Sequence, residues 1–157
     1  IRDRPEFAHP DLLADVPRLE SMLDESDRPD LELINRRTLR SNNSWMHNLQ
    51  VLVKGKPRCT LRMHPDDAGN RGLRTGDPAR VTSDSGEVVV AVEITDALRP
   101  GVVSLPHGWG HGAPGTSMRV AAEHAGVNVN ILTPSQSIDP LSGTSQLTGI
   151  PVTVEAV

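Results

Sequence analysis

The chain has 157 residues, of which 36% are apolar and 2% are aromatic, and its formal net charge is −4 at pH 7. This length suits one domain with its own hydrophobic core. No window approaches the roughly 18 to 20 apolar residues that a membrane helix needs, so no membrane span is expected in this chain. The absence of a basic balance argues against general nucleic-acid binding but allows one small anionic ligand.

The negative charge is concentrated near the start of the chain. Residues 1–30 hold nine acidic and four basic residues, whereas residues 31–157 hold eleven acidic and twelve basic ones. Apolar residues in the first segment recur at helical spacing, which predicts an amphipathic helix over about 16–25, or two shorter pieces, with Pro17 in a first turn. We therefore expect an acidic, partly helical arm or linker over residues 1–30. Its apolar stripe should dock on the main domain or on a neighbouring one.

The rest of the chain predicts short strands joined by turns, since it is rich in Gly and Pro and poor in aromatic residues. Strands are expected at residues 31–36, 59–63, 79–83, 87–94, 102–105 and 150–154. The turn at 83–86 joins two of them into a hairpin. Helices are expected from Pro65 towards Gly72 and over 118–124. Six or seven strands with two or three short helices indicate a mainly β fold, consistent with a closed barrel.

A loop rich in hydrogen-bond donors follows the first predicted strand. From Ile34 to Ser44 the sequence reads Ile-Asn-Arg-Arg-Thr-Leu-Arg-Ser-Asn-Asn-Ser, without an acidic residue. Such a run suits a pyrophosphate or a polar heterocycle, because guanidinium groups offer a charged, planar fork of donors. Arg36 and Arg37 would point to opposite faces of a strand, so at most one should reach the ligand directly. The alternative is a solvated strand end.

Three further stretches carry a resemblance to a known family. They contain Leu61-Arg62-Met63-His64-Pro65-Asp66-Asp67-Ala68 with the later Gly76-Asp77, then His107-Gly108-Trp109-Gly110, then Asn130-Ile131-Leu132-Thr133. In this order and spacing, residues 31–157 resemble the C-terminal dinucleotide-binding domain of molybdopterin oxidoreductases, the group related to dimethyl sulfoxide reductase, formate dehydrogenase and nitrate reductase.

The resemblance implies a double-psi β-barrel that helps to hold a molybdenum or tungsten ion bound by two molybdopterin guanine dinucleotides. It places the metal's protein ligand and any iron–sulfur cluster on other domains. The implied partners are therefore the remaining domains of a parent oxidoreductase, where a small-molecule substrate would bind. The isolated chain should have no turnover, and no catalytic or metal-ligating residue is expected in it.

Matching the family motif residue by residue gives an expected set of cofactor contacts. Arg37 resembles the arginine of the family's Thr-Gly-Arg pattern, although Asn35-Arg36 replaces Thr-Gly here. The expected cofactor-binding residues are Arg37, Ser41, Asn42, Asn43, Ser44, His107, Gly108, Trp109, Asn130 and Thr133. Asparagine amides can match the alternating donors and acceptors of a pterin edge, and glycines beside Trp109 allow the backbone to approach a flat ligand closely.

Other functions fit the sequence less well. His107 and His111 are four residues apart, but the Gly-Trp-Gly between them rules out a regular helix and disfavours a zinc site. The single cysteine, Cys59, excludes an internal disulfide and suits a small buried side chain. A barrel that acts as a protein-binding adaptor would need an exposed apolar groove. A self-processing decarboxylase would need an adjacent Gly-Ser pair, which the sequence lacks.

Overall fold

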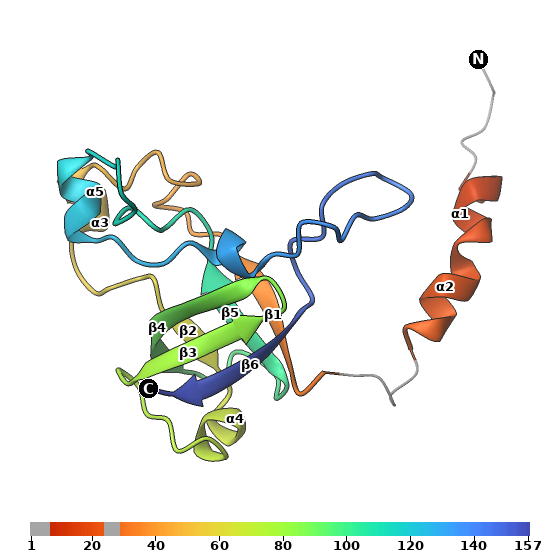
Figure 1. Ribbon diagram of the computed structural model, residues 1–157, viewed down its shortest axis with the longest axis horizontal. Helices are drawn as coiled ribbons and strands as arrows, with labels where there is room; N and C mark the ends of the chain where they lie inside the picture. Colours follow the sequence, from red (N-terminus) through yellow and green to blue (C-terminus); the bar gives the residue numbers. More distant parts are fainter. Residues whose placement is uncertain (1–6, 24–28) are drawn as a thin grey trace.

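A closed six-stranded barrel forms the body of the protein in the computed structural model, which describes residues 7–23 and 29–157 (Figure 1). The strands are β1 Leu31–Arg36, β2 Leu61–Met63, β3 Pro78–Ser83, β4 Gly86–Ile94, β5 Val102–Pro106 and β6 Ile150–Ala156. Their order around the barrel is β1-β5-β2-β4-β3-β6. The pairs β1–β5 and β2–β4 are parallel and the other pairs are antiparallel. The predicted fold class, a mainly β double-psi barrel, is confirmed.

Short helices connect and flank the strands. They are α1 Pro10–Ala14, α2 Val16–Ser21, α3 Gln50–Val53, α4 Pro65–Gly69, α5 Arg119–Glu123 and the 3-10 helix η2 Val129–Leu132. At α4 the ring of His64 accepts a hydrogen bond from the Asp66 amide at 3.2 Å, and Pro65 occupies the first helical position, where its missing N–H costs nothing. In the described residues, no helix is long and apolar enough to cross a membrane.

The barrel interior is filled by Val, Leu, Ile and Met side chains. On β4, Val88, Val90 and Val92 are buried while Val89 and Ala91 are exposed, as expected for a strand with one face in the core. β5, which lies between β1 and β2, is buried along its whole length. Each such side chain contributes about 1.5 to 3 kcal/mol on burial. The strands therefore form a rigid support for the loops at their ends.

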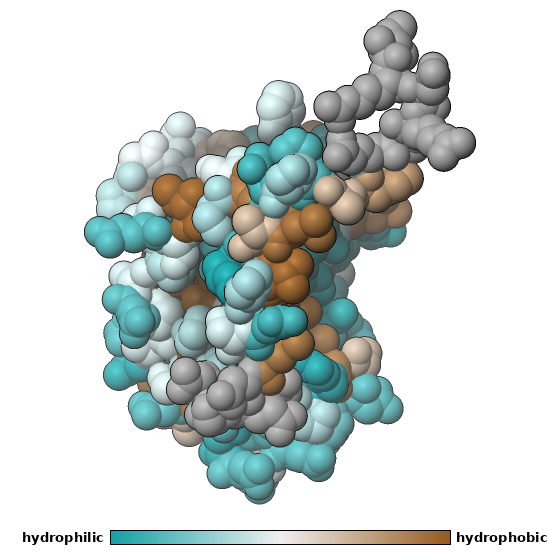
Figure 2. Space-filling model, turned by 90° about the vertical axis from the view of Figure 1, so that its right-hand side faces the viewer, coloured by the Kyte–Doolittle hydropathy of each residue, from teal (hydrophilic) through white to brown (hydrophobic). Residues whose placement is uncertain are grey.

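The N-terminal arm forms two short helices, α1 and α2, which stand apart from the barrel (Figure 1). This matches the alternative of two shorter pieces; residues 24 and 25 of the predicted helix lie outside the described residues. The apolar side chains of the arm, including Leu19 and Leu23, are exposed, and Figure 2 shows hydrophobic side chains gathered along the arm. Arg18 of the arm lies 3.7 Å from Asp139, and Met22 lines a hollow together with Arg99 and Pro100 of the main domain. Docking of the stripe, on the barrel or on a neighbouring domain, and the boundary at residue 30 stay predictions.

Candidate cofactor-binding site

Two loops that follow parallel strands lie against each other at one end of the barrel. Arg36 at the end of β1 is in register with Pro106 at the end of β5, so the next residues of both strands emerge side by side. The His107 amide donates to the Arg36 carbonyl at 3.0 Å. At Gly108 a Cβ would overlap the Asn43 carbonyl oxygen, and its φ of +92° also favours glycine. Residues 41–44 and 107–111 therefore pack backbone to backbone.

The third predicted segment joins these loops through Gly110. A Cβ on Gly110 would lie 2.7 Å from the Asn128 Cβ, and the amide of Gly110 donates to the Ala125 carbonyl at 2.9 Å. The Asn128 side chain accepts from the Asn130 amide at 3.0 Å and so begins η2. The fold therefore brings the three predicted segments together, with Asn130 and Thr133 at the far end of the group.

The exposed side of this junction carries donors of the expected kind. Arg37 is exposed and donates to the Asn43 side-chain oxygen. Asn42 and Asn43 have φ of +43° and +61°, a left-handed conformation that asparagine tolerates better than most residues. Asparagine at these positions therefore has a structural role in the turn, in addition to any contact with a ligand. Burial, and then the charge of Arg37, lower the pKa of His107, so its ring is neutral at pH 7.

Three of the ten predicted residues carry buried polar groups. Ser41 is only 2% exposed, and its hydroxyl lies 2.8 Å from the His47 Nε2. The Trp109 indole N–H and the Thr133 hydroxyl are buried without a hydrogen-bond partner in the described residues. Buried polar groups in native proteins are nearly always paired, so these two groups fit a site completed by something outside the chain.

Sequence reasoning missed His47, which lies at the centre of the junction. Its ring is buried, bonds to Ser41 and His111, and stacks on Trp109 with ring centroids 4.0 Å apart. Burial lowers the pKa of His47 to about 4, and a charge on His111 acts in the same direction. Nothing in the sequence Trp45-Met46-His47 separates a buried histidine from an exposed one. His111, weighed only as a zinc ligand, is instead a hydrogen-bond partner of His47.

Arg36, unlike the exposed Arg37, bonds to backbone carbonyls within the barrel. Its guanidinium donates to the carbonyls of Ser104 and Thr60, each at 3.0 Å, and thereby connects β1 to β5 and to the residues before β2. Burial lowers the pKa of Arg36 to about 10, and the nearby charge of Arg62 acts in the same direction. The two arginines do diverge, and Arg37 is the exposed one.

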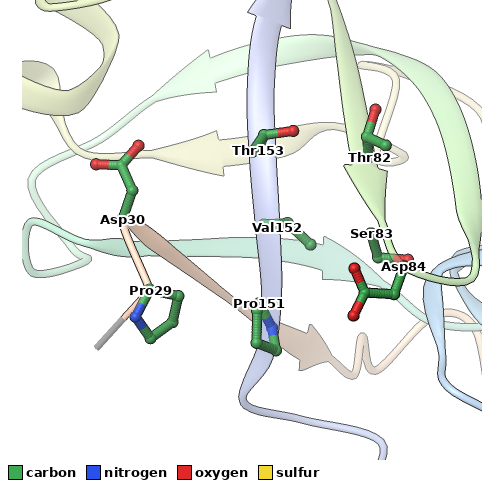
Figure 3. A pocket seen from close by; sticks show the side chains of 8 residues that line it. All are labelled: Pro29, Asp30, Thr82, Ser83, Asp84, Pro151, Val152 and Thr153. Atoms are coloured by element: carbon green, nitrogen blue, oxygen red, sulfur yellow. The ribbon is translucent and has the colours of Figure 1, made fainter. Parts of the chain in front are cut away.

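A separate hollow of about 310 Å³ lies beside β3 and β6 and is not part of the junction. Figure 3 shows Asp30, Thr82, Asp84 and Thr153 around it. Two carboxylates at this hollow disfavour an anionic ligand. In the described residues no group of three His, Cys, Asp or Glu side chains is arranged to hold a metal ion. The loop junction, in contrast, carries exposed donors that suit an anionic, heterocyclic ligand.

A closed barrel with polar, glycine-rich loops at one end defines a cofactor-binding class of domain, and comparison with known proteins identifies the family. Residues 31–151 match the family model described as "Molydopterin dinucleotide binding domain". The chain belongs to this family.

Relatives with assigned names are large enzymes. The chain is 29% identical to the arsenate respiratory reductase molybdopterin-containing subunit ArrA of Chrysiogenes arsenatis, over 92% of this chain and 17% of that protein. It is 37% identical to the dimethyl sulfoxide reductase DmsA of Haemophilus influenzae, over 64% of this chain and 12% of that protein. Among solved structures, acetylene hydratase from Pelobacter acetylenicus shares the fold with a TM-score of 0.68 and 23% identity, over 92% of this chain and 20% of that one.

Proposed function

We propose that this chain binds molybdopterin guanine dinucleotide as the C-terminal domain of a molybdenum-dependent oxidoreductase. The observation that carries the proposal is the backbone contact between Gly108 and Asn43, which presents the exposed donors of residues 37–44 beside residues 107–111. Such a cradle needs little rearrangement on binding, which lowers the entropic cost of ordering it. The unpartnered groups of Trp109 and Thr133 support the same site.

Different residues of the site would bind different parts of the cofactor. Arg37 would bind the diphosphate, because its guanidinium keeps its charge and its donors face solvent. The exposed amides of Asn42 and Asn130 would match the polar edge of a heterocycle. Gly108 would act indirectly, because its missing Cβ lets Asn43 pack against the loop after β5 and so fixes the donors beside the ring system. The bound cofactor would supply a redox-active metal, molybdenum or tungsten, and this chain would hold and orient it.

The same face would be covered by the remaining domains of a parent enzyme. The chain spans 12 to 20% of the length of the three proteins reported above. Leu39 is 97% exposed and Trp45 is 82% exposed, and both flank the candidate loop. Large apolar side chains at this exposure mark a contact surface. The names of two relatives, an arsenate reductase and a dimethyl sulfoxide reductase, favour reductive chemistry on a small substrate held by those domains, with no turnover by this chain alone.

A protein-binding adaptor is the second candidate, because the barrel does carry an apolar hollow. It measures about 400 Å³ and is lined by Val88, Val89, Val127 and Ile131 with several glycines. An extended partner segment would bury these residues. The hollow lies next to Gly110, so the two functions make distinct but neighbouring contacts.

An amide NMR titration of the chain with GDP, followed by the pterin dinucleotide released from a purified enzyme, separates the two functions. We expect shifts confined to residues 36–47, 107–111 and 128–133, and weaker binding after Arg37→Ala or Asn130→Ala. Arg80→Ala, on the exposed side of β3, should leave the affinity unchanged. If the pterin dinucleotide causes no shifts, or shifts only around Val89, the proposal is wrong and the adaptor function is favoured.

A further inference from the structure

A buried chain of hydrogen bonds links the two loops of the candidate site. The His47 Nε2 lies 2.8 Å from the Ser41 hydroxyl, and the His47 Nδ1 lies 2.7 Å from the His111 Nε2. The Ser41 hydroxyl also contacts the Thr38 hydroxyl. Ser41, His47 and His111 are 2%, 1% and 7% exposed. Water therefore has little access, and these polar groups depend on one another for their hydrogen bonds.

The cluster spans both sides of the junction. Ser41 and His47 lie at the two ends of the turn that holds the candidate ligand-binding asparagines, while His111 belongs to the loop after β5. The His47 ring also stacks on Trp109, with an interplanar angle of 27° and centroids 4.0 Å apart. The His47 imidazole thus contacts Ser41 of its own loop through Nε2. It contacts the loop after β5 through Nδ1, which bonds to His111, and through its ring face, which stacks on Trp109.

The hydrogen bonds can be satisfied without any charge. A neutral imidazole has one donor and one acceptor, so His47 can donate to one neighbour and accept from the other. Burial lowers the pKa of both His47 and His111. For His47, charges on His111 and Arg58 act in the same direction, while the Gly108 carbonyl opposes them. The cluster is therefore neutral at pH 7.

Two kinds of contact hold the turn between Ser41 and His47. Backbone packing of Asn43 on Gly108 holds its middle, and the Asn48 side chain just after it accepts hydrogen bonds from α5 amides at 3.0 and 3.1 Å. Asn42 and Asn43 have positive φ, and such conformations persist only where the surroundings hold them. The apolar side chains on either side of Ser41, at Leu39 and Trp45, are largely exposed and contribute little burial. Ser41 and His47, at the two ends of the turn, are its buried side-chain anchors.

We propose that His47 is a positioning residue that holds the 41–44 turn in its ligand-binding conformation through Ser41 and His111. The role in binding rests on the proposed function, whereas the ordering of the turn does not need a ligand. Removal of the imidazole leaves the His111 Nε2 buried without this partner and leaves the Ser41 hydroxyl with Thr38 alone. It also removes the stacking on Trp109, which weakens the hold of the turn on residues 107–111. The donors around Asn43 then have to be ordered at the moment of binding, which weakens the affinity.

The test combines ligand-free and ligand-bound measurements on the whole chain. Imidazole ¹⁵N shifts in wild type should show His47 and His111 neutral at pH 7 and each in one tautomer, with a pKa of about 4 for His47 and a lowered pKa for His111. In His47→Ala, amide hydrogen exchange should rise about tenfold in residues 38–48 and stay unchanged in β3 and β6. The Kd for GDP should rise about tenfold in His47→Ala and less in His47→Gln, since a glutamine amide keeps one donor and one acceptor.

Two control variants separate positioning from general destabilisation. His124→Gln removes a half-buried histidine after α5 and should change neither exchange nor affinity. Val154→Ala removes core volume from β6 and should lower thermal stability without changing the Kd.

A Kd raised equally by Val154→Ala and the His47 variants, unchanged exchange in 38–48, or a His47 that titrates near 6.5 would overturn the proposal. If His47→Ala does not fold, His47→Gln decides. Failure of wild type to bind GDP or the pterin dinucleotide would count against the proposed function alone, because the ring shifts and exchange rates are measured without ligand.

Discussion

The barrel wall and the loop end of this protein are held together by different forces. The wall buries Val, Leu and Ile side chains from all six strands, an interaction that is strong in sum but has no direction. Of the five buried polar or charged residues found in the described chain, three lie at the loop end: Ser41, His47 and His111. Their contacts depend on angle and protonation. The wall should therefore tolerate small changes of shape, whereas the loop end should respond sharply to a single atom or proton.

The sharpest test of this contrast is Gly108→Ala. The new Cβ would overlap the Asn43 carbonyl oxygen, and backbone cannot move aside as a flexible side chain can. We expect a loss of more than about 3 kcal/mol in the free energy of unfolding, measured by denaturant titration. Gly115→Ala is the matched control, because its φ is +87° but nothing lies within 4 Å of its Cβ, so only conformational strain of about 1 kcal/mol is expected. Equal losses in both variants would contradict the tight contact.

The second prediction concerns pH. His47 has a pKa of about 4 in the folded protein and about 6.5 in the unfolded chain, so the unfolded state binds more protons between these values. The stabilising effect of its neutral form is complete above pH 6.5 and is lost as the pH falls to 4. We expect wild type to lose about 2 to 3 kcal/mol more than His47→Gln over this range. Parallel stability curves of the two proteins would show that His47 is not buried in neutral form.

The third prediction separates two arginines of the same loop. Arg37 contacts Asn43 at the junction, while Arg40 is exposed elsewhere in the loop. Loss of a charge-assisted hydrogen bond to a diphosphate costs about 1.5 to 3 kcal/mol, so Arg37→Ala should weaken binding of the pterin dinucleotide by roughly ten- to a hundredfold. Arg40→Ala makes the same change of net charge and should have an effect below about threefold. Isothermal titration calorimetry measures the affinity of both variants for the pterin dinucleotide. Equal losses of affinity in Arg37→Ala and Arg40→Ala would mean that Arg37 acts only by long-range electrostatic attraction.

The same contrast explains what the sequence could predict. Strand patterns such as those of β4 are local, because alternation of apolar and polar residues is visible in the chain itself, and they predict a mainly β fold. The double-psi barrel came from the family resemblance. The ten candidate site residues came from a family motif, and the fold does bring their three segments together. The hydrogen bond between His47 and His111 joins residues 64 positions apart, and no local pattern contains it.

Burial of Ser41 was hidden for the same reason, since serine in an Asn-rich loop is usually exposed and its partner is the missed His47. The docking partner of the arm could not be predicted, because an apolar stripe shows that a helix needs a partner but not which one. The directions of Arg36 and Arg37 were predictable, since strand geometry alone sets them.

The smallest expected effect lies in the arm, which belongs neither to the wall nor to the loop end. Leu19 is half exposed on α2, so Leu19→Ser should change the free energy of unfolding of this chain by less than about 0.5 kcal/mol. Val152→Ala, inside the barrel on β6, is the comparison and should cost about 1 to 3 kcal/mol. A clear loss in Leu19→Ser would mean that the arm packs on the barrel in solution. A negligible loss, combined with weaker association of Leu19→Ser with the other domains of a parent enzyme, would assign the apolar stripe to that interface.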